Sequence, residues 1–493
     1  MKLGYNEIMI VSMYFNDIND FINLEIGIKR FQGNMERFHF NPIPLNKYSR
    51  KLFTNIETFH IYNKNDKIFN DGRIIKQVIW YLVNYSKYLQ EKEQGNICKN
   101  IEYTEEDRKS YGNTIPPEVK SVGDYCFYNC DELTTINIPS SISKIGNGCF
   151  NECSSLKSIN IPTTISKIGY YCFNECLSLT SINIPTTINE IGNECFNGCI
   201  SLKSINIPSS VSKIDKDWCF YEYSSLTSMN IDNLQFVSKE RIFMNEPVLV
   251  SIEIPENLQI INGKNIEKKD INEFIIPSSI TKLEHRCFSR CSALKTINIP
   301  SSINEIGNEC FNECLSLTSI TIPTTISKIG NRCFRGCSSI IFINIPTHVS
   351  KLGNECFYEC SSLKSINIPI SINKIGNCCF YGCTTLTSIN IPTPISKIEG
   401  GCFYECKSLT SINIPTTINE IGDDCFNRCS SLTSINIPSS VSKIGDWCFS
   451  YCLSLTSINI PSSITSFGDG CFYECGCEEE LKKNERIPRN CFK

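Results

Sequence analysis

Cysteines at a fixed short spacing are the residues of this chain that could most readily do chemistry. Thirty-one of the 493 residues are cysteine, and thirteen stretches read Cys-Phe-x-x-Cys, from Cys126/Cys130 to Cys471/Cys475. Thiolates bind zinc and attack electrophiles, and this spacing would place two side chains on one side of a helical turn. The pattern therefore allows three interpretations: a metal site, a set of disulfides or a packing motif.

Packing is the interpretation that the surrounding sequence favours. No histidine accompanies any pair, whereas structural zinc usually takes two close sets of ligands. The N-terminal sequence MKLGYNEIMIVSMYF is a poor signal peptide, so we expect reduced thiols. A buried free cysteine behaves as a small apolar side chain. We therefore predict a structural core ladder whose members include Cys149, Phe150, Cys153, Cys310, Phe311, Cys314, Cys402, Phe403 and Cys406.

Catalysis has little support in the sequence. There are only four histidines, and His285 lies two residues before Cys287. A histidine that activates a thiol needs suitable geometry and an orienting partner, and proximity in sequence supplies neither. The HExxH, GxSxG, phosphate-loop and dinucleotide-binding patterns are absent from the sequence. We predict that the protein is not an enzyme and holds no cofactor or metal.

The cysteine pairs belong to a repeat that covers most of the chain. A coil here means one 23-residue repeat, and Pro116 and Pro461 are fifteen periods apart, which indicates about sixteen coils. An Ile-Pro pair marks fifteen of the coils, with its proline at Pro116, Pro139, Pro162, Pro185, Pro208, Pro255, Pro277, Pro300, Pro323, Pro346, Pro369, Pro392, Pro415, Pro438 and Pro461.

One coil shows which elements must position the cysteines. The segment from Leu156 to Ile161 ends in strict alternation, which predicts a short strand that turns Ile159 and Ile161 to one side. The stretch Ile142–Ile145 predicts a second short extended piece, and Cys149–Cys153 fits one helical turn. A single coil buries too little apolar surface to stand alone, so successive coils must stack.

The repeat IPxxIxKIGxxCFxxCxSLxSIN resembles the BspA-like leucine-rich repeats over residues 111–476. The resemblance implies an α+β repeat protein, with a right-handed solenoid of short parallel strands. It also implies protein recognition or adhesion, because families of this type are associated with both. Two coils depart from the pattern, with Ile242-Phe243 and Asn265-Ile266 in place of Cys-Phe, and we expect these coils to be less well packed.

Columns of polar residues must face outward between the buried strand positions. Asparagine and serine recur there, and stacked amides can hydrogen bond along a ladder, which is first a structural role. One coil breaks the column with two apolar residues, which is typical of a binding hot spot, although drift in a redundant array would look the same. The candidate partner-binding residues are Ile341, Phe342, Asn344, Lys364, Ser365 and Asn367.

The two ends of the chain lack the repeat. Residues 1–110 form an N-terminal non-repeat domain with two predicted amphipathic helices, over 8–15 and 20–31, a strand within 53–63, and a strand or helix over 78–85. The helical pair is similar to an F-box, which implies docking to a ubiquitin ligase. The alternative is a cap over the first coil. The charged residues 477–493 predict a polar C-terminal cap.

Charge and hydropathy narrow the partners. A net charge of -4 and a pI near 5.8 argue against a nucleic-acid-binding surface. No segment approaches the ~18 apolar residues of a membrane-spanning helix. We expect a cytoplasmic protein by default, with the cell surface reached by a non-classical route as the alternative. The expected partner is a protein, with a glycan or another surface ligand left open.

Overall fold

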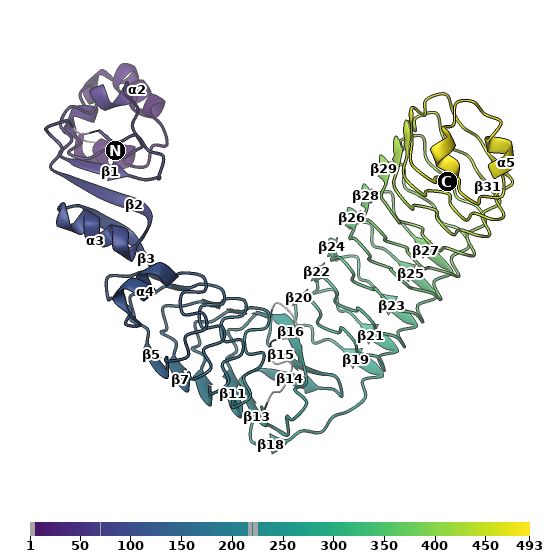
Figure 1. The fold of residues 1–493 in the computed structure, drawn as a ribbon, viewed down its shortest axis with the longest axis horizontal. Coiled ribbons are helices and arrows are strands. Elements are labelled where there is room, and N and C mark those ends of the chain that lie inside the picture. Colours follow the sequence, from purple (N-terminus) through teal and green to yellow (C-terminus); the bar gives the residue numbers. More distant parts are fainter. Residues whose placement is uncertain (1–4, 70, 215–218, 220–224) are drawn as a thin grey trace. The chain divides into compact units, whose positions relative to one another are not determined.

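The computed structural model describes residues 5–69, 71–214, 219 and 225–493, which fold into two compact units. The first unit comprises Met1–Thr187 with Cys195–Ser201, and the second comprises Ile188–Glu194 with Leu202–Lys493. Each unit is built mainly from short strands stacked side by side, as the ribbon in Figure 1 shows.

The elements of the first unit are, in chain order, α1 (Tyr5–Ser12), α2 (Ile18–Gly27), the 3-10 helices η1 (Lys29–Phe31), η2 (Met35–Arg37) and η3 (Ser49–Lys51), β1 (Thr58–Ile61), β2 (Lys76–Asn84), α3 (Tyr85–Glu93), β3 (Ile97–Tyr103), α4 (Glu105–Tyr111), β4 (Ser121–Val122), β5 (Thr135–Asn137), β6 (Lys144–Ile145), β7 (Ser158–Asn160), β8 (Lys167–Ile168) and β9 (Ser181–Asn183).

Those of the second unit are β10 (Glu190–Ile191), β11 (Ser204–Ile207), β12 (Lys213–Ile214), β13 (Ser228–Ile231), β14 (Leu234–Val237), β15 (Arg241–Met244), β16 (Val248–Glu253), β17 (Ile260–Ile261), β18 (Lys264–Asn265), β19 (Glu273–Ile275), β20 (Lys282–Leu283), β21 (Thr296–Asn298), β22 (Glu305–Ile306), β23 (Ser319–Thr321), β24 (Lys328–Ile329), β25 (Phe342–Asn344), β26 (Lys351–Leu352), β27 (Ser365–Asn367), β28 (Lys374–Ile375), β29 (Lys397–Ile398), β30 (Glu420–Ile421), β31 (Ser434–Ile435), β32 (Lys443–Ile444), β33 (Ser457–Ile458), β34 (Ser466–Phe467), α5 (Glu478–Leu481) and the 3-10 helix η5 (Arg489–Phe492).

The N-terminal helices are confirmed, with boundaries a few residues earlier than expected. Helix α2 begins after Asp17, whose carboxylate accepts backbone N–H groups of Asn19 and Asp20. Such a side chain satisfies two of the N–H groups that a helix start leaves unpaired. Phe21 of α2 is fully buried, with its ring centroid 5.4 Å from that of Phe53. This small aromatic core holds the helical region together.

A parallel sheet joins the non-repeat residues to the first coils. Strands β1, β2, β3, β4 and β6 lie in that order, all parallel. The strand expected within 53–63 is present as β1, and the ambiguous segment at 78–85 lies in strand β2. Thr58 faces Lys76 and Val78 faces Ile97, so these strands pair at a shorter sequence offset than one coil. The strand ladder therefore begins well before the repeat does.

Each regular coil contributes two short strands to two separate ladders. In β7 the side chain of Ile159 is buried between exposed neighbours, and Ile159 pairs with Ile182 of the next coil. The Lys-Ile pieces form the second ladder, for example Ile306 beside Ile329. Figure 1 shows these ladders in the second unit as two rows of labels, with β19 to β27 in one and β20 to β28 in the other. Both expected extended pieces are confirmed.

The Cys-Phe-x-x-Cys stretch is not a helical turn, which corrects the expectation for Cys149–Cys153. The residue before each of these cysteines is left-handed, with φ of 56° at Gly148 and 59° at Glu152. The N–H groups of Gly148, Phe150 and Glu152 all point along the stack. They donate to carbonyl oxygens of the next coil over 2.7 to 2.9 Å. We call this stretch, with the residue before it, the Cys-Phe turn.

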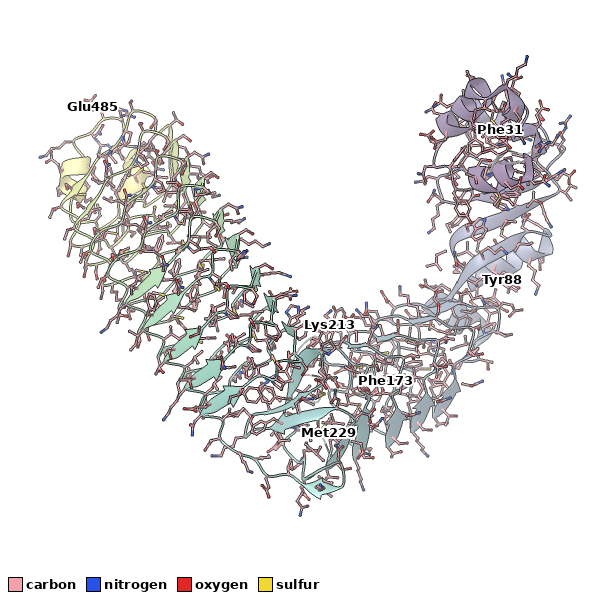
Figure 2. All side chains as sticks on the ribbon, turned by 180° about the vertical axis from the view of Figure 1, so that it is seen from behind. Phe31, Tyr88, Phe173, Lys213, Met229 and Glu485 are labelled. Atoms are coloured by element: carbon pink, nitrogen blue, oxygen red, sulfur yellow. The ribbon has the colours of Figure 1, made fainter. Side chains whose placement is uncertain are left out.

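The phenylalanines of the Cys-Phe turns form continuous stacks inside each unit. In the second unit the ring of Phe311 is parallel to within 4° to that of Phe334, with centroids 5.5 Å apart. In the first unit Phe173 stacks on Phe150 in the same way, at 5.6 Å. The label of Phe173 in Figure 2 lies among the side chains of these coils. Offset stacking at this separation adds about 1 kcal/mol per pair to the burial itself.

The departures around residues 232–276 are an antiparallel insertion. Strands β14, β15 and β16 pair antiparallel, and β16 then pairs parallel with β20 to rejoin the ladder. Ile242 and Phe243 on β15 are fully buried, so the expectation of poorer packing there is wrong. Phe243 replaces a turn phenylalanine, with its centroid 5.0 Å from that of Phe288. At the other departure Asn265 is exposed, as a looser coil predicts.

The C-terminal residues complete the hydrogen bonds of the last coil. The N–H groups of Gly470 and Phe472 donate to the carbonyl oxygens of Asn490 and Cys491. These are the bonds that a regular Cys-Phe turn makes to its successor. Cys491 is fully buried, so η5 also covers the end of the apolar core.

The glycine after the inner isoleucine marks where neighbouring coils come closest. A Cβ atom on Gly307 would lie 2.6 Å from the backbone nitrogen of His285 and 2.7 Å from the carbonyl carbon of Glu284. No such contact can relax by moving a side chain, because both atoms belong to the preceding coil's backbone. The Ile-Gly pair of the repeat is therefore a requirement of coil spacing.

We predict that Gly307→Ala separates two coils and destabilises the protein by about 3 kcal/mol, as overpacking does. Thermal unfolding followed by circular dichroism should show a midpoint lower by about 5 °C, with faster amide exchange in the coils on either side. Gly27→Ala is the control, because a Cβ there meets no atom within 4 Å. Equal midpoints for the two variants would contradict the close approach.

Candidate functional site

The cysteines of the Cys-Phe turns are packing groups inside the stack. All nine side chains predicted for the core ladder have no exposed surface. The second cysteine of a regular pair also donates a hydrogen bond through its sulfur to the carbonyl of the phenylalanine in the preceding coil. The Sγ–O distance is 2.9 Å from Cys153 to Phe127 and 3.1 Å from Cys314 to Phe288. The thiol is thus a second donor to a carbonyl that, as at Phe288, already accepts the backbone N–H of Cys291 in its own coil.

Burial also removes the chemical reactivity of these thiols. The pKa of Cys153 is raised to about 12, chiefly by burial, and burial raises the pKa of Cys149 and Cys314 well above the ordinary value. The thiolate is the form that attacks electrophiles and binds metals. Among the described residues, no group of three or more His, Cys, Asp or Glu side chains is placed to hold a metal ion.

His285 takes part in a structural ladder. Its Nδ1 accepts the N–H of Asn308 over 2.8 Å. In the next coil the side-chain oxygen of Asn308 accepts the N–H of Asn331 over the same distance. His285 therefore fills the place of an asparagine, although its Nε2 also lies 3.4 Å from Glu284.

His60 lies in an aromatic cluster of the first unit. Its ring stacks on Phe40 with centroids 4.8 Å apart. Its pKa is lowered to about 4, first by burial and then by the charge of Lys99. The ring is therefore neutral at neutral pH and acts as a flat packing group.

The six candidate partner-binding residues lie on two neighbouring strands or directly before them. Phe342 faces Ser365 and Asn344 faces Asn367 across the parallel pair β25–β27, and the N–H of Lys364 donates to the carbonyl of Ile341. Ile341 and Phe342 are 49% and 50% exposed, which is unusual for large apolar side chains between polar neighbours. The structure thus brings all six residues to one patch, which we call the strand patch.

The paired asparagines of the strand patch bond to each other. The Asn367 side-chain nitrogen donates to the Asn344 side-chain oxygen over 2.9 Å, and both side chains are exposed. The asparagine column therefore has, at this pair, the hydrogen bond between stacked amides that the sequence predicts. Each amide still has free hydrogen-bonding capacity, because a side-chain amide can make up to four bonds.

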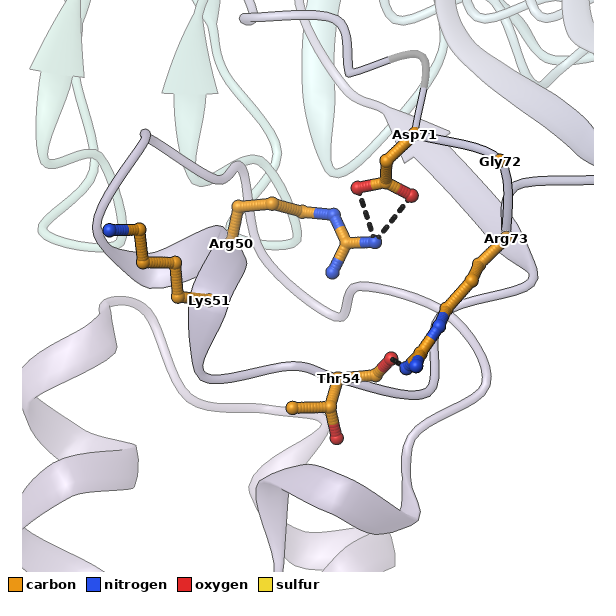
Figure 3. A pocket seen from close by; sticks show the side chains of 6 residues that line it. All are labelled: Arg50, Lys51, Thr54, Asp71, Gly72 and Arg73. Carbon is orange, nitrogen blue, oxygen red and sulfur yellow. Dashed lines mark hydrogen bonds and ion pairs between the residues drawn. The ribbon is translucent and has the colours of Figure 1, made fainter.

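A loop pocket in the first unit was not anticipated from the sequence. Its volume is about 520 Å³, and Arg50, Lys51 and Arg73 line it together with Asp71. Figure 3 shows the Asp71 carboxylate facing the Arg50 guanidinium, with contacts of 2.7 and 2.8 Å. Arg73 donates to the carbonyl of Thr54 over 2.6 Å. The arginines are thus engaged in holding the loop together.

A stack of tyrosines on the Cys-Phe turns was also missed. Tyr358, Tyr381 and Tyr404 each follow the phenylalanine of their turn, and their centroids are 4.4 and 4.5 Å apart. The recurring sequence Cys-Phe-Tyr was the signal that could have revealed it. Only the stacking of coils turns residues one coil apart into one continuous aromatic surface.

The repeats match known proteins of one kind. A family model described as BspA type leucine rich repeat region (6 copies) matches residues 111–227, 166–294, 264–387 and 373–493. A solved leucine-rich repeat protein from Bacteroides ovatus is 28% identical, with a TM-score of 0.41 over 77% of this chain and 90% of that one. A leucine rich cell surface protein from Faecalibacterium prausnitzii is 19% identical, with a TM-score of 0.35 over 72% and 87%.

A leucine-rich repeat protein from Eubacterium ventriosum is 21% identical, with a TM-score of 0.34 over 73% of this chain and 83% of that one. A search of curated proteins finds no significant match. In the described part of the chain, every helix is too short or too polar to cross a bilayer.

We predict that nearly all of the 31 thiols of the native protein resist a water-soluble disulfide reagent at pH 8. Cys98 and Cys378 are the partly exposed ones, so they should react first. The pKa of Cys98 is raised to about 11, mainly by burial and also by Glu91. Its thiolate fraction, and hence its rate, should grow about tenfold per pH unit from pH 8 to pH 10.

The control is the Cys98→Ser/Cys378→Ser double variant, which should lose the early phase and keep the slow remainder. Denaturant should release all remaining thiols at once. Rapid native reaction of many cysteines would show that the core ladder is open to solvent.

Proposed function

The chain belongs to the family of BspA-type leucine-rich repeat proteins, and on that premise we propose that it is a non-catalytic scaffold. In this proposal the strand patch on β25 and β27 binds a protein partner. The observation that carries the proposal is the exposure of Ile341 and Phe342 at positions where other coils have Lys or Thr and then Ser or Thr.

The chemistry of the strand patch suits a protein surface. Burying two half-exposed apolar side chains stabilises a complex by about 1 kcal/mol each. The polar neighbours Lys364, Ser365 and Asn367 lie beside them, and a polar rim around an apolar centre is the usual anatomy of a binding site. An asparagine column would also suit a glycan, which makes hydrogen bonds but offers little apolar area. The two apolar residues favour a protein.

The absence of catalysis is part of the proposal. Burial raises the pKa of core thiols such as Cys149 and Cys314, which makes them poor nucleophiles, and His285 is engaged by the N–H of Asn308.

We propose the cytoplasm as the location, because a reducing compartment keeps cysteines as thiols and the sequence carries 31 of them. Display at the cell surface is the alternative. Biotinylation of intact cells with a membrane-impermeant reagent would label the chain only in that case.

A second candidate function is an adaptor whose N-terminal helices dock to a ubiquitin ligase. The observation that favours it is an exposed apolar group on α1 and α2 and next to them. Tyr14 is 82% exposed, Ile26 76% and Ile10 54%. Large apolar side chains on short helices are a common docking surface.

For the strand patch we predict that Ile341→Thr/Phe342→Ser weakens partner binding about tenfold to thirtyfold, as loss of about 2 kcal/mol implies. Neighbouring coils carry Thr or Lys and then Ser at these positions, so the fold should tolerate both changes. The measurement is affinity capture from native cells with mass spectrometry, followed by titration of the captured partner.

Ile370→Ser is the matched control. Ile370 is 80% exposed but lies outside the strand patch. Its replacement should leave capture unchanged. Equal capture by all three proteins would remove the strand patch from the proposal, and equal loss in both variants would indicate a nonspecific apolar effect.

For the N-terminal helices we predict that Tyr14→Ser/Ile26→Ser abolishes recovery of ubiquitin-ligase subunits if the adaptor role is real. The side chains are exposed, so the thermal midpoint should stay the same. Capture of strand-patch partners should also be retained. Failure of the unaltered chain to recover any ligase subunit would reject this candidate.

A further inference from the structure

A shallow groove crosses five consecutive Cys-Phe turns of the second unit. Its volume is about 480 Å³. It lies on the turns and not on strands β25 and β27, so nothing in it depends on the strand patch. We call it the turn groove. Its main lining residues are Glu313, Gly336, Glu359, Gly382, Glu405 and Tyr381.

Glutamate and glycine alternate along the floor of the turn groove at one structural position. This is the left-handed residue before the second cysteine, with φ of 56° at Glu359 and 69° at Gly382. The glycines leave recesses between the glutamates. A Cβ added to Gly382 would lie 3.2 Å from Cγ of Glu359, so that glutamate extends along the groove toward the recess. Each recess therefore has a carboxylate on either side.

The tyrosine stack forms one wall of the groove. Tyr381 lines it directly, held between Tyr358 and Tyr404 with ring planes within 7° and 2° of parallel. Burial and the neighbouring Tyr358, Tyr404 and Glu405 raise the pKa of Tyr381 to about 12. The phenol therefore keeps its proton and presents a rigid apolar edge with a hydrogen-bond donor.

The protein binds one of its own arginines with the same kind of groups. The Arg335 guanidinium carbon lies 4.8 Å from the Tyr358 ring centroid, and its nitrogens lie 3.6 Å from Glu313 and 3.5 Å from Glu355. A cation held over an aromatic face and between carboxylates is stabilised by both. Arg335 thus shows, within this chain, which chemistry these turns accommodate.

The two glutamates farther along the groove, Glu359 and Glu405, differ in their ion pairs. No basic side chain among the described residues lies within ion-pair distance of Glu359. Glu405 has only the longer contacts of 3.6 Å to Lys407 and 3.9 Å to Arg428. The groove lining as a whole contains three glutamates and one arginine, a balance of -2. The recess over Gly382 is therefore acidic. Among the described residues, Glu359 beside it has no ion-pair partner like the one that Arg335 provides for Glu313.

We propose that the turn groove binds an extended basic segment of a partner protein, with Lys or Arg side chains in the recesses over Gly336 and Gly382. These recesses are two coils apart, or about 10 Å at the ~4.8 Å spacing of stacked strands. In a polyproline II segment, every third side chain points the same way after about 9.3 Å. The matching ligand is an extended chain with basic residues three positions apart.

The experiment is a fluorescence anisotropy titration of the full chain against labelled twelve-residue peptides. The probe is an acetylated peptide of four Pro-Pro-Arg units. One comparison peptide has Glu in place of Arg, and another has the same composition with arginine at every second position, so that no two are three apart. We expect saturable binding of the probe, about tenfold weaker binding of both comparison peptides, and weakening with salt.

Two variants locate the binding site. Glu359→Gln should weaken binding about threefold to tenfold, as loss of one partly exposed carboxylate does. Gly382→Arg should weaken it by more than about tenfold, because an internal guanidinium would fill the recess. Arg290 and Arg428 occupy the same left-handed position in other coils, so the fold accommodates arginine there.

Gly198→Arg is the matched control, since Gly198 holds that position in a coil outside the groove. It should bind the probe like the unaltered chain. Absence of saturable binding, equal affinity for all three peptides, or unchanged affinity in both groove variants would overturn the proposal. If Gly382→Arg unfolds by circular dichroism, Glu359→Gln alone decides.

Discussion

The structure depends first on the backbone hydrogen bonds between neighbouring coils. Each regular coil bonds to the next through two short parallel ladders and through its Cys-Phe turn, and the bonded residues belong to adjacent coils. A buried backbone group without a partner costs as much as a lost hydrogen bond, so this offset cannot drift. Each position of the repeat therefore lies in a fixed column along the stack, either buried or exposed, and the column limits the size and polarity of its residues.

The inward columns stabilise the fold, and the outward columns are available for recognition. Inward columns are nearly invariant within this sequence: isoleucine on the strands, and cysteine and phenylalanine on the turns. Glycine is required where the backbones of two coils come closest, as at Gly307, because a Cβ atom would not fit there. Outward columns carry no such constraint, so their departures are the informative ones. Ile341 and Phe342 break a polar strand column, and Gly336 and Gly382 alternate with glutamates in a turn column.

Where the offset changes, other structures complete the ladder. The antiparallel strands β14 to β16 bury Ile242 and Phe243 and return the chain to the parallel ladder at β20. Near the N-terminus, strands β1 to β3 pair at a shorter offset and prolong the ladder with a different sequence. The ladder thus depends on backbone pairing and buried apolar side chains, and the repeat motif is one way of supplying both.

The sequence by itself determined the period, the buried face of each strand and the packing role of the cysteines. These follow from local rules, because alternation assigns the two faces of a strand and an exact repeat forces equal neighbours to stack. The strand patch could also be chosen from the sequence, since Ile341 and Phe342 interrupt a column visible in the repeat. Its six residues are one coil apart in the sequence, so the 23-residue period is enough to predict that they lie side by side.

Only the tertiary structure decided the rest. The left-handed residues at Gly148 and Glu152 could not be read from Cys-Phe-x-x-Cys, because glutamate adopts that conformation here only in return for bonds to the next coil. The early strands β1 to β3 share no motif with the repeats, so their pairing in line with β4 and β6 could not be predicted from the period. The turn groove likewise exists only when five coils align their glutamates, glycines and tyrosines, which is a property of contact between residues far apart in the chain.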